Sequence, residues 1–440
     1  MEFELRNPKG TNDYSPEAQS VRQKIVRILQ AVFERYGFQP LETPILCHYD
    51  VLASKYGGGA EILKETYRLS DQGKRELGLR YDLTVPFARY IGMNPTLRLP
   101  FKRYEIGKVF RDGPVKLGRN REFTQCDVDV VGVSGMLAEA ELMAMTVDVF
   151  AKLGLEVEIR YNNRKLLAGI IALAGIPSAL NGAAILVLDK LEKIGRPGVQ
   201  AELEERGVPA AAGERLLELI SRPEADVFTA GQPVPGQPLL MEGWSELRQL
   251  QAYLSEIDQG TPMRFSPSLA RGLAVYTGTV WEIFLRDGSI SSSVGAGGRY
   301  DRIIGTFIGK GGDYPAVGMT FGLDVIYEAL MLKDIALVQS PPPVDLLLIP
   351  LGTEPEAFGM VSRLRRRGYR VALSLNRPKL KKAFDDANKL RIPLVVVLGE
   401  NELARGQVKL KRMLDGAEIV ISIEQLEEGG WEQYREKPTI

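Results

Sequence analysis

The sequence KRYEIGKVFRDGPVKLGRNREFTQCDVDVVG, residues 102–132, decides the fold. The residues from Lys102 to Phe110 and from Glu122 to Val133 have the β-branched and aromatic composition of strands. A basic stretch from Lys116 to Arg121 separates them. We therefore expect two long antiparallel strands joined by a basic loop.

The ends of this hairpin carry charged residues. Arg111 closes the first strand, and Arg121 and Glu122 open the second. Such a hairpin can hold a polyphosphate, because a guanidinium group binds two phosphate oxygens at once and stays charged. A loop whose arginines are simply solvated is the alternative for these residues taken alone.

The second strand has one polar face. Strand alternation places Gln125, Asp127 and Asp129 on one side and the residues between them on the other. A carboxylate and an amide on one strand could bind an ammonium group and a second donor. A solvated sheet face explains the same pattern equally well.

The start of the chain predicts a helix followed by a short strand. Ser15 suits an N-cap and Pro16 the first helical position. Apolar residues recur at helical spacing from Val21 to Tyr36, and Gly37 ends the run. We expect a strand from Leu41 to Ile45.

The middle of the chain changes character twice. From about Leu166 to Tyr253 the composition favours helices, punctuated by Pro and Gly. Arg271 to Phe284 and Ser291 to Ala296 return to strand character, and Gly322 to Leu330 is helical. These patterns predict an α+β unit built on one antiparallel sheet, with a helical insertion.

Consecutive prolines at Ser340–Pro343 indicate a stiff linker before a second unit. Strands and helices then alternate, which predicts a small α/β domain with a largely parallel sheet. The expected elements are Asp345 to Pro350, Ala357 to Arg367, Arg370 to Leu375, Leu380 to Leu390 and Leu394 to Leu398. Residues 344–413 contain 15 Lys and Arg against 7 Asp and Glu, a basic excess typical of phosphate binding.

Composition narrows the chemistry. The 440 residues carry a formal net charge of +0 and 45% hydrophobic residues, which is ordinary for globular chains. The single histidine, His48, excludes mechanisms that need several imidazole groups. Cys47 and Cys126 are too isolated in the sequence to predict a disulfide or zinc site. No run suits a membrane span or secretion signal, so we expect a cytoplasmic protein.

Residues 102–132 resemble motif 2 of the class II aminoacyl-tRNA synthetases, and in detail that of the histidyl-tRNA synthetase family. Four further segments match the family in order: LRYDLTVPFARY at 79–90, RGLAVYTGTVWE at 271–282, GAGGRYD at 295–301 and PAVGMTFGLD at 315–324. The resemblance covers nearly the whole chain. It implies a catalytic domain at 1–335 with a helical insertion at about 166–255, a linker at 336–343 and an anticodon-binding domain at 344–440.

The resemblance also implies a histidine site. Asp82, Thr84 and Gln125 resemble the residues that hold the α-ammonium group, which suits one carboxylate and two neutral oxygens. Asp129 and Tyr276 resemble the pair that recognises the two imidazole nitrogens. A pocket that requires two polar partners rejects apolar amino acids, because they would leave buried groups unpaired.

Two arginines resemble the catalytic groups of the family. Arg111 resembles the residue on the α-phosphate of ATP, and Arg271 the histidyl-specific arginine on the opposite side. Arg121 and Glu122 resemble further ATP-binding residues, with Glu122 near the adenine. The resemblance implies histidine, ATP and tRNA as substrates, Mg²⁺ bound with the ATP at ligands that the sequence does not locate, and a homodimer formed through motif 1.

The sequence departs from the family pattern at three positions. Ala274 and Val275 replace a common Asp-Tyr pair, and Val325 stands where the family commonly has an arginine on the γ-phosphate. These changes leave an alternative open, a paralogue like the histidine-sensing regulatory subunit of ATP phosphoribosyltransferase. Such subunits generally lack the anticodon-binding domain. A tRNA-binding module without catalysis is disfavoured by Arg111 and Arg271.

Overall fold

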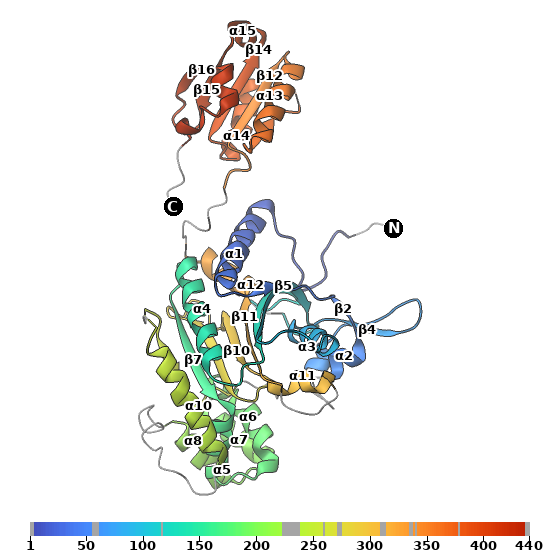
Figure 1. Ribbon diagram of the computed structural model, residues 1–440, viewed down its shortest axis with the longest axis vertical. Helices are drawn as coiled ribbons and strands as arrows, with labels where there is room; N and C mark the ends of the chain where they lie inside the picture. Colours follow the sequence, from blue (N-terminus) through green and yellow to red (C-terminus); the bar gives the residue numbers. More distant parts are fainter. Residues whose placement is uncertain are drawn as a thin grey trace. The chain divides into compact units, whose positions relative to one another are not determined.

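The computed structural model forms two compact units, Met1–Val338 and Gln339–Ile440 (Figure 1). The residues that it describes are 4–54, 61–115, 118–221, 238–257, 260–270, 275–308, 314–333, 338, 341–376 and 379–435. Each unit has its own hydrophobic core. Within the described residues, no helix is both long enough and apolar enough to span a bilayer.

Eight described strands of the first unit form one large sheet. In spatial order they are β1 (Gln39–Pro40), β5 (Phe101–Phe110), β6 (Glu122–Val131), β11 (Ala316–Gly322), β10 (Gly295–Arg299), β9 (Thr279–Leu285), β7 (Val157–Asn163) and β8 (Met263–Phe265). The pairs β1–β5 and β7–β8 are parallel, and all other neighbours are antiparallel. The predicted antiparallel sheet and the β5–β6 hairpin are confirmed.

Helices cover both faces of this sheet (Figure 1). One face packs against α1 (Pro16–Arg35), α4 (Leu137–Leu153) and α12 (Leu323–Met331), whose apolar residues share a core with Val128 and Val130. The other face meets α3 (Thr84–Met93) and α11 (Asp301–Ile308). Beside it lie α2 (Tyr49–Ser54), η1 (Glu61–Glu65) and a small sheet of β2 (Leu46–His48), β4 (Glu76–Leu79) and β3 (Arg68–Ser70).

The N-terminal helix begins as its sequence predicts. The Ser15 hydroxyl accepts a hydrogen bond from the Ala18 N–H, and Pro16 opens the helix. The expected strand from Leu41 to Ile45 is wrong. The Leu41 N–H still donates to the Tyr104 carbonyl of β5. The Thr43 N–H, however, donates to the Glu105 carboxylate, and the Thr43 carbonyl accepts from the Arg80 side chain, so strand pairing ends before Thr43.

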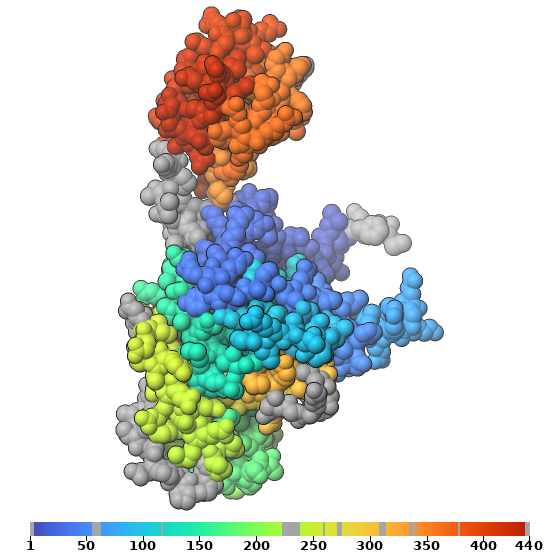
Figure 2. Space-filling model, viewed as in Figure 1, coloured from blue at the N-terminus to red at the C-terminus, as the bar shows by residue number. Residues whose placement is uncertain are grey.

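Helices fill the insertion between β7 and β8. They are α5 (Arg164–Leu173), η2 (Ser178–Leu180), α6 (Asn181–Leu188), α7 (Leu191–Glu205), α8 (Ala210–Leu219) and α10 (Pro238–Leu254). α5 packs closely on α10, because a Cβ on Gly243 would lie 2.3 Å from the Leu166 nitrogen. The insertion, coloured green to yellow-green, packs directly against the rest of its unit (Figure 2). The predicted helical insertion is confirmed.

Two expected strands are shorter than predicted. Of the expected Arg271 to Phe284, the structure describes residues from Val275 onward, and β9 begins only at Thr279. The strand expected from Ser291 to Ala296 was predicted to begin too early, because β10 starts at Gly295. Hydroxyl-rich residues 291–293 precede a strand of small residues, so composition alone gave the wrong boundary.

The second unit has a mixed sheet in the order β13-β12-β14-β15-β16. Its elements are β12 (Leu346–Leu351), α13 (Glu354–Arg366), β13 (Val371–Leu373), α14 (Leu380–Lys389), β14 (Leu394–Gly399), α15 (Glu400–Arg405), β15 (Gln407–Arg412), β16 (Glu418–Ser422), α16 (Ile423–Glu428) and η4 (Glu432–Tyr434). β13, β12 and β14 are parallel as expected, whereas β15 and β16 are antiparallel. The expectation of a largely parallel sheet is therefore correct for its first half only.

A buried ion pair ties α1 to α12. The Arg22 guanidinium lies 2.8 Å from Asp324, and both side chains are buried. Asp324 also accepts hydrogen bonds from the Tyr14 hydroxyl at 2.7 Å and the Thr124 N–H at 2.9 Å. Asp324 lies in the Gly-Leu-Asp-Val sequence, which departs from the family pattern at Val325. Its contacts link the N-terminal segment, β6 and α12.

We predict that Asp324→Ala lowers the free energy of unfolding of the first unit by about 3 to 5 kcal/mol, because Arg22 would remain buried without its partner. Urea denaturation measures this loss. Glu156→Ala is the control, since its pair with Arg286 is largely exposed and should contribute little. A loss for Asp324→Ala no larger than the control's would contradict the assignment.

Candidate functional site

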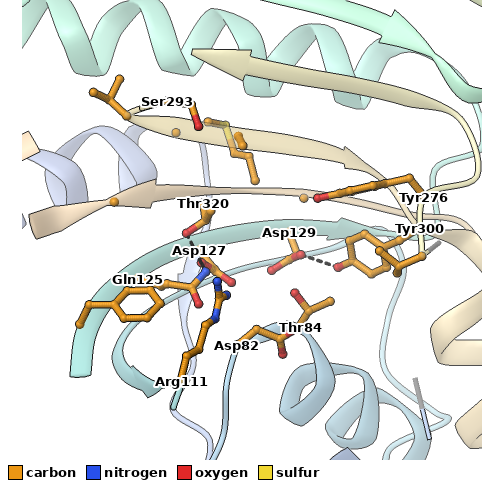
Figure 3. A pocket seen from close by; sticks show the side chains of 18 residues that line it. Asp82, Thr84, Arg111, Gln125, Asp127, Asp129, Tyr276, Ser293, Tyr300 and Thr320 are labelled. Atoms are coloured by element: carbon orange, nitrogen blue, oxygen red, sulfur yellow. Dashed lines mark hydrogen bonds between the residues drawn. The ribbon is translucent and has the colours of Figure 1, made fainter. Parts of the chain in front are cut away.

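A cavity of about 290 Å³ opens on the polar face of the large sheet. Ten of the side chains that line it are labelled in Figure 3: Asp82, Thr84, Arg111, Gln125, Asp127, Asp129, Tyr276, Ser293, Tyr300 and Thr320. This volume is near the lower end for small-molecule sites, which span roughly 300 to 1,000 Å³. The lining is rich in charged and hydroxyl groups, so the cavity suits a small polar ligand.

The cavity floor is built by strand pairing. Asp129 lies opposite Gly318 of β11, Asp127 opposite Thr320, and Gln125 opposite Gly322. A Cβ at Gly318 would lie 2.0 Å from the Asp129 carboxylate. Glycine at this position therefore leaves the room that the carboxylate occupies. The predicted polar face of β6 is confirmed.

Asp129 is held from two sides. The Tyr300 hydroxyl donates a hydrogen bond to one of its oxygens (Figure 3). The Arg103 guanidinium lies 2.7 Å from the other oxygen. Burial raises the pKa of Asp129, while Arg103 and Tyr300 oppose that rise.

Arg103 is completely buried on β5, directly opposite Asp129. Burial disfavours its charge, but the carboxylates of Asp129, Asp127 and Glu105 raise its pKa above the ordinary value. Its guanidinium carbon lies 4.2 Å from the centre of the Phe87 ring in α3. The guanidinium is therefore a fixed positive charge behind the cavity.

Asp82 and Thr84 come from the start of α3. The Asp82 carboxylate accepts a hydrogen bond from the Val85 N–H at 3.0 Å, and Thr84 is the first residue of the helix. A carboxylate at a helix N-terminus is stabilised by the helix dipole. Figure 3 shows both residues beside Asp129 in the cavity wall.

Arg111 lines the cavity at the end of β5. Its Nε donates to the Tyr81 carbonyl at 3.0 Å, and its guanidinium carbon lies 5.1 Å from the centre of the Phe123 ring. The backbone N–H of Arg111 donates to the Arg121 carbonyl at 2.8 Å, which closes the hairpin. An anion that enters the cavity would meet this guanidinium.

Tyr276 packs over a second glycine. A Cβ at Gly298 would lie 2.5 Å from the Tyr276 ring, so the small residue allows the aromatic side chain to lie against β10. Val275 also lines the cavity. Arg299, the neighbour of Gly298 on β10, does not line the cavity. Its guanidinium pairs with the buried Glu139 carboxylate through contacts of 2.6 and 2.8 Å.

The cavity unites Asp82, Thr84, Arg111, Gln125, Asp129 and Tyr276, six of the predicted site residues. Arg121 and Glu122 are not among its lining residues. Arg121 pairs with Asp112 at 3.1 Å, and Glu122 pairs with Lys108. Arg271 and Ala274 lie outside the described residues, so the placement of the second predicted catalytic arginine stays a prediction.

Sequence reasoning assigned no individual role to several cavity residues, among them Asp127, Tyr300 and Thr320. It also missed Arg103 and Glu105 behind the cavity. Both alternate with apolar residues on β5, so the same two-residue period that identified the polar face of β6 could have identified them. Tyr300 follows a strand and carried no periodic signal.

Asp127 is buried between its neighbours. The Gln125 amide donates to Asp127 at 3.4 Å and to the Thr320 hydroxyl at 3.1 Å. Burial raises the pKa of Asp127 to about 7; Arg103 opposes the rise and Asp129 adds to it. The carboxyl group therefore changes charge near neutral pH.

The described residues contain no group of three or more His, Cys, Asp or Glu side chains that could hold a metal ion. The polar lining of the candidate site consists of acids, an amide, hydroxyls and a guanidinium. Such a set can bind an amino acid by its ammonium group and hold a phosphate at Arg111.

The antiparallel sheet, its acidic cavity and the separate α/β unit fit an aminoacyl-tRNA ligase, and the comparisons with known proteins show that class. The sequence profile of histidyl-tRNA synthetases matches residues 10–326, and that of the anticodon binding domain matches residues 345–429. Histidine–tRNA ligase 1 of Bacillus cereus is 52% identical over 425 residues, covering 96% of this chain and 99% of that relative. The chain belongs to the histidyl-tRNA synthetase family.

Solved structures have the same fold. Histidyl-tRNA synthetase from Nostoc sp. aligns with a TM-score of 0.83 and 28% identity, over 98% of this chain and 100% of that one. An ATP phosphoribosyltransferase regulatory subunit/histidyl-tRNA synthetase from Bacillus halodurans aligns with a TM-score of 0.71 over 88% of this chain and 97% of that one. At 19% identity the second likeness shows the fold alone.

We predict that Asp127→Asn raises the melting temperature more at pH 8 than at pH 5. The native pKa of about 7 exceeds the unfolded value of about 3.9, so the native state binds more protons between these values. Its stability therefore falls as pH rises through this range, and asparagine removes that loss. Scanning calorimetry at both pH values measures the difference.

Asp287→Asn provides the control for this measurement. Lys333 and the neighbouring Ser289 hold the pKa of Asp287 at about 2, so this carboxylate is ionised at both pH values. Its variant should change the melting temperature equally at pH 5 and pH 8. An equal effect of Asp127→Asn at both values would show that the buried carboxyl group does not titrate in this range.

Proposed function

We propose that this chain activates histidine with ATP and transfers it to the 3′ end of a tRNA. The histidine carboxylate, already ionised at neutral pH, attacks the α-phosphorus of ATP and displaces pyrophosphate. A tRNA hydroxyl then attacks the histidyl-adenylate and releases AMP. The cavity that holds six predicted site residues, together with the near full-length likeness to histidine–tRNA ligases, carries this proposal.

The histidine ammonium group is assigned to Asp82, Thr84 and Gln125. One carboxylate and two neutral oxygens match its three protons. The Val85 N–H at the start of α3 donates to the Asp82 carboxylate and so fixes the orientation of this acceptor. The imidazole ring is assigned to Asp129 and Tyr276, which also line the cavity.

Arg111 is assigned to the α-phosphate. Negative charge concentrates on the equatorial oxygens during attack, and a fixed guanidinium stabilises that charge more than it stabilises bound ATP. Arg271 is proposed to act from the opposite side. Arg121 and Glu122 are proposed to hold ATP at the hairpin, and Mg²⁺ would neutralise the phosphates while using few protein ligands.

The regulatory alternative accounts less well for the second unit. Regulatory paralogues need no anticodon recognition, whereas residues 345–429 match the anticodon binding domain. We propose that this unit reads the tRNA anticodon.

We also propose a cytoplasmic homodimer. Three apolar side chains of the small-sheet region, Ile45, Leu46 and Leu69, are exposed and could be covered by a second copy. Light scattering of the purified protein in solution would test this assembly.

We predict that purified protein catalyses ATP–pyrophosphate exchange with histidine as the only amino acid, and that Arg111→Ala lowers this exchange at least about 100-fold. Arg286→Ala is the control, because this guanidinium is half-exposed and pairs with Glu156. Exchange that is absent in the native enzyme while histidine still binds would favour the regulatory alternative. Undiminished exchange in Arg111→Ala would remove its catalytic role.

We predict that Gly318→Ala raises the KM for histidine at least about tenfold, because the new methyl group would occupy the position of the Asp129 carboxylate. Gly182→Ala in α6 is the control, because Gly182 does not line the cavity and a Cβ there would meet no neighbouring atom within 4 Å. Steady-state exchange kinetics measure both, and equal KM values for the two variants would contradict the placement of histidine against Asp129.

A further inference from the structure

Four buried charges alternate in sign behind the cavity. Arg80 lies 2.7 Å from Glu105, Arg103 lies 3.6 Å from the same carboxylate, and Arg103 lies 2.7 Å from Asp129. Glu105 is further held by two groups of Thr43, at 2.9 and 3.0 Å. Ordinary charge states for these four groups sum to zero.

Asp129 is the member of this row that lines the cavity. One oxygen of its carboxylate already accepts a hydrogen bond from Tyr300, and the Arg103 guanidinium lies beside the other oxygen. A second cation in front of it would stand close to Arg103 in a site of low dielectric constant, where like charges repel strongly. An uncharged N–H group requires only an acceptor.

Building on the proposed function, we propose that Arg103 is a positioning residue that neutralises Asp129, so that the cavity takes histidine with an uncharged imidazole ring and excludes the imidazolium form. The guanidinium does not reach the ligand itself, because Phe87 and the Leu83 carbonyl enclose it and its residue is fully buried. It acts through the carboxylate.

Three other acids interact electrostatically with Asp129. Glu105 on β5 is committed to Arg80, and Asp82 is bonded to the start of α3. Asp127 on β6 is the remaining acid. Burial raises its pKa to about 7, so it loses its charge as the pH falls toward the range where free histidine becomes imidazolium. Acid pH therefore makes the cavity less able to accept a second cation.

Exchange kinetics across pH test the inference. The KM for histidine is compared with the KM for a triazole analogue whose ring stays uncharged, from about pH 5.5 to pH 8. Titration of the protein affects both ligands, so their ratio isolates protonation of the imidazole. Below about pH 6.5, we expect the KM for histidine divided by the KM for the analogue to increase toward tenfold for each unit of pH decrease. A ratio that is constant or falls in acid would overturn the inference.

Substitution of Arg103 tests the role of its charge. Arg103→Met leaves Asp129 without its buried cation, so the cavity should also bind the imidazolium form. The KM ratio of this variant should therefore increase less as the pH falls. We expect kcat to change less than the KM for histidine. Arg103→Lys keeps the charge and should retain the acid rise, and a flat ratio in this variant would contradict a charge effect.

The native enzyme keeps the test decisive even if Arg103→Met does not fold, because its own KM ratio either rises in acid or does not. The same measurements distinguish a failure of the proposed function from a failure of this inference. An enzyme without histidine-dependent exchange at any pH would refute the proposed function, whereas exchange with a constant KM ratio would refute only the uncharged-ring inference.

Discussion

The ion pair between Arg103 and Asp129 is the interaction on which the rest of the site depends. Both side chains are buried on adjacent strands, directly opposite each other. A buried carboxylate without a cation would take up a proton, and a buried guanidinium without an anion would destabilise the fold. The antiparallel pairing of β5 and β6 therefore determines both the stability of the sheet and the charge of the cavity.

The remaining features of the cavity follow from this constraint. Gly318 must be small so that the Asp129 carboxylate can turn into the cavity, and Gly298 must be small so that Tyr276 can lie against β10. The helix α3 closes the opposite wall and brings an acid at its N-terminus. A sheet with one charged face and one apolar face thus positions a polar ligand while α1, α4 and α12 supply the core.

The sequence predicted the elements that have a regular period. Alternation on β6 identified Gln125 and Asp129, and the capped helix at Ser15 has the expected start. It failed where side chains replace strand pairing, as at Thr43, and where small residues obscure a boundary, as before β10. Tyr300 was missed because its role arises from a contact with Asp129, which is far away in the sequence, whereas Arg103 was overlooked although it alternates with apolar residues on β5.

The most direct test is the ¹⁵N nuclear magnetic resonance spectrum of ring-labelled histidine bound to the native enzyme at about pH 6, near the point where the free ring titrates. The account predicts the signals of an uncharged ring with one protonated nitrogen, in contrast to the partly protonated ligand in solution. Signals of a doubly protonated imidazolium in the bound state would contradict it.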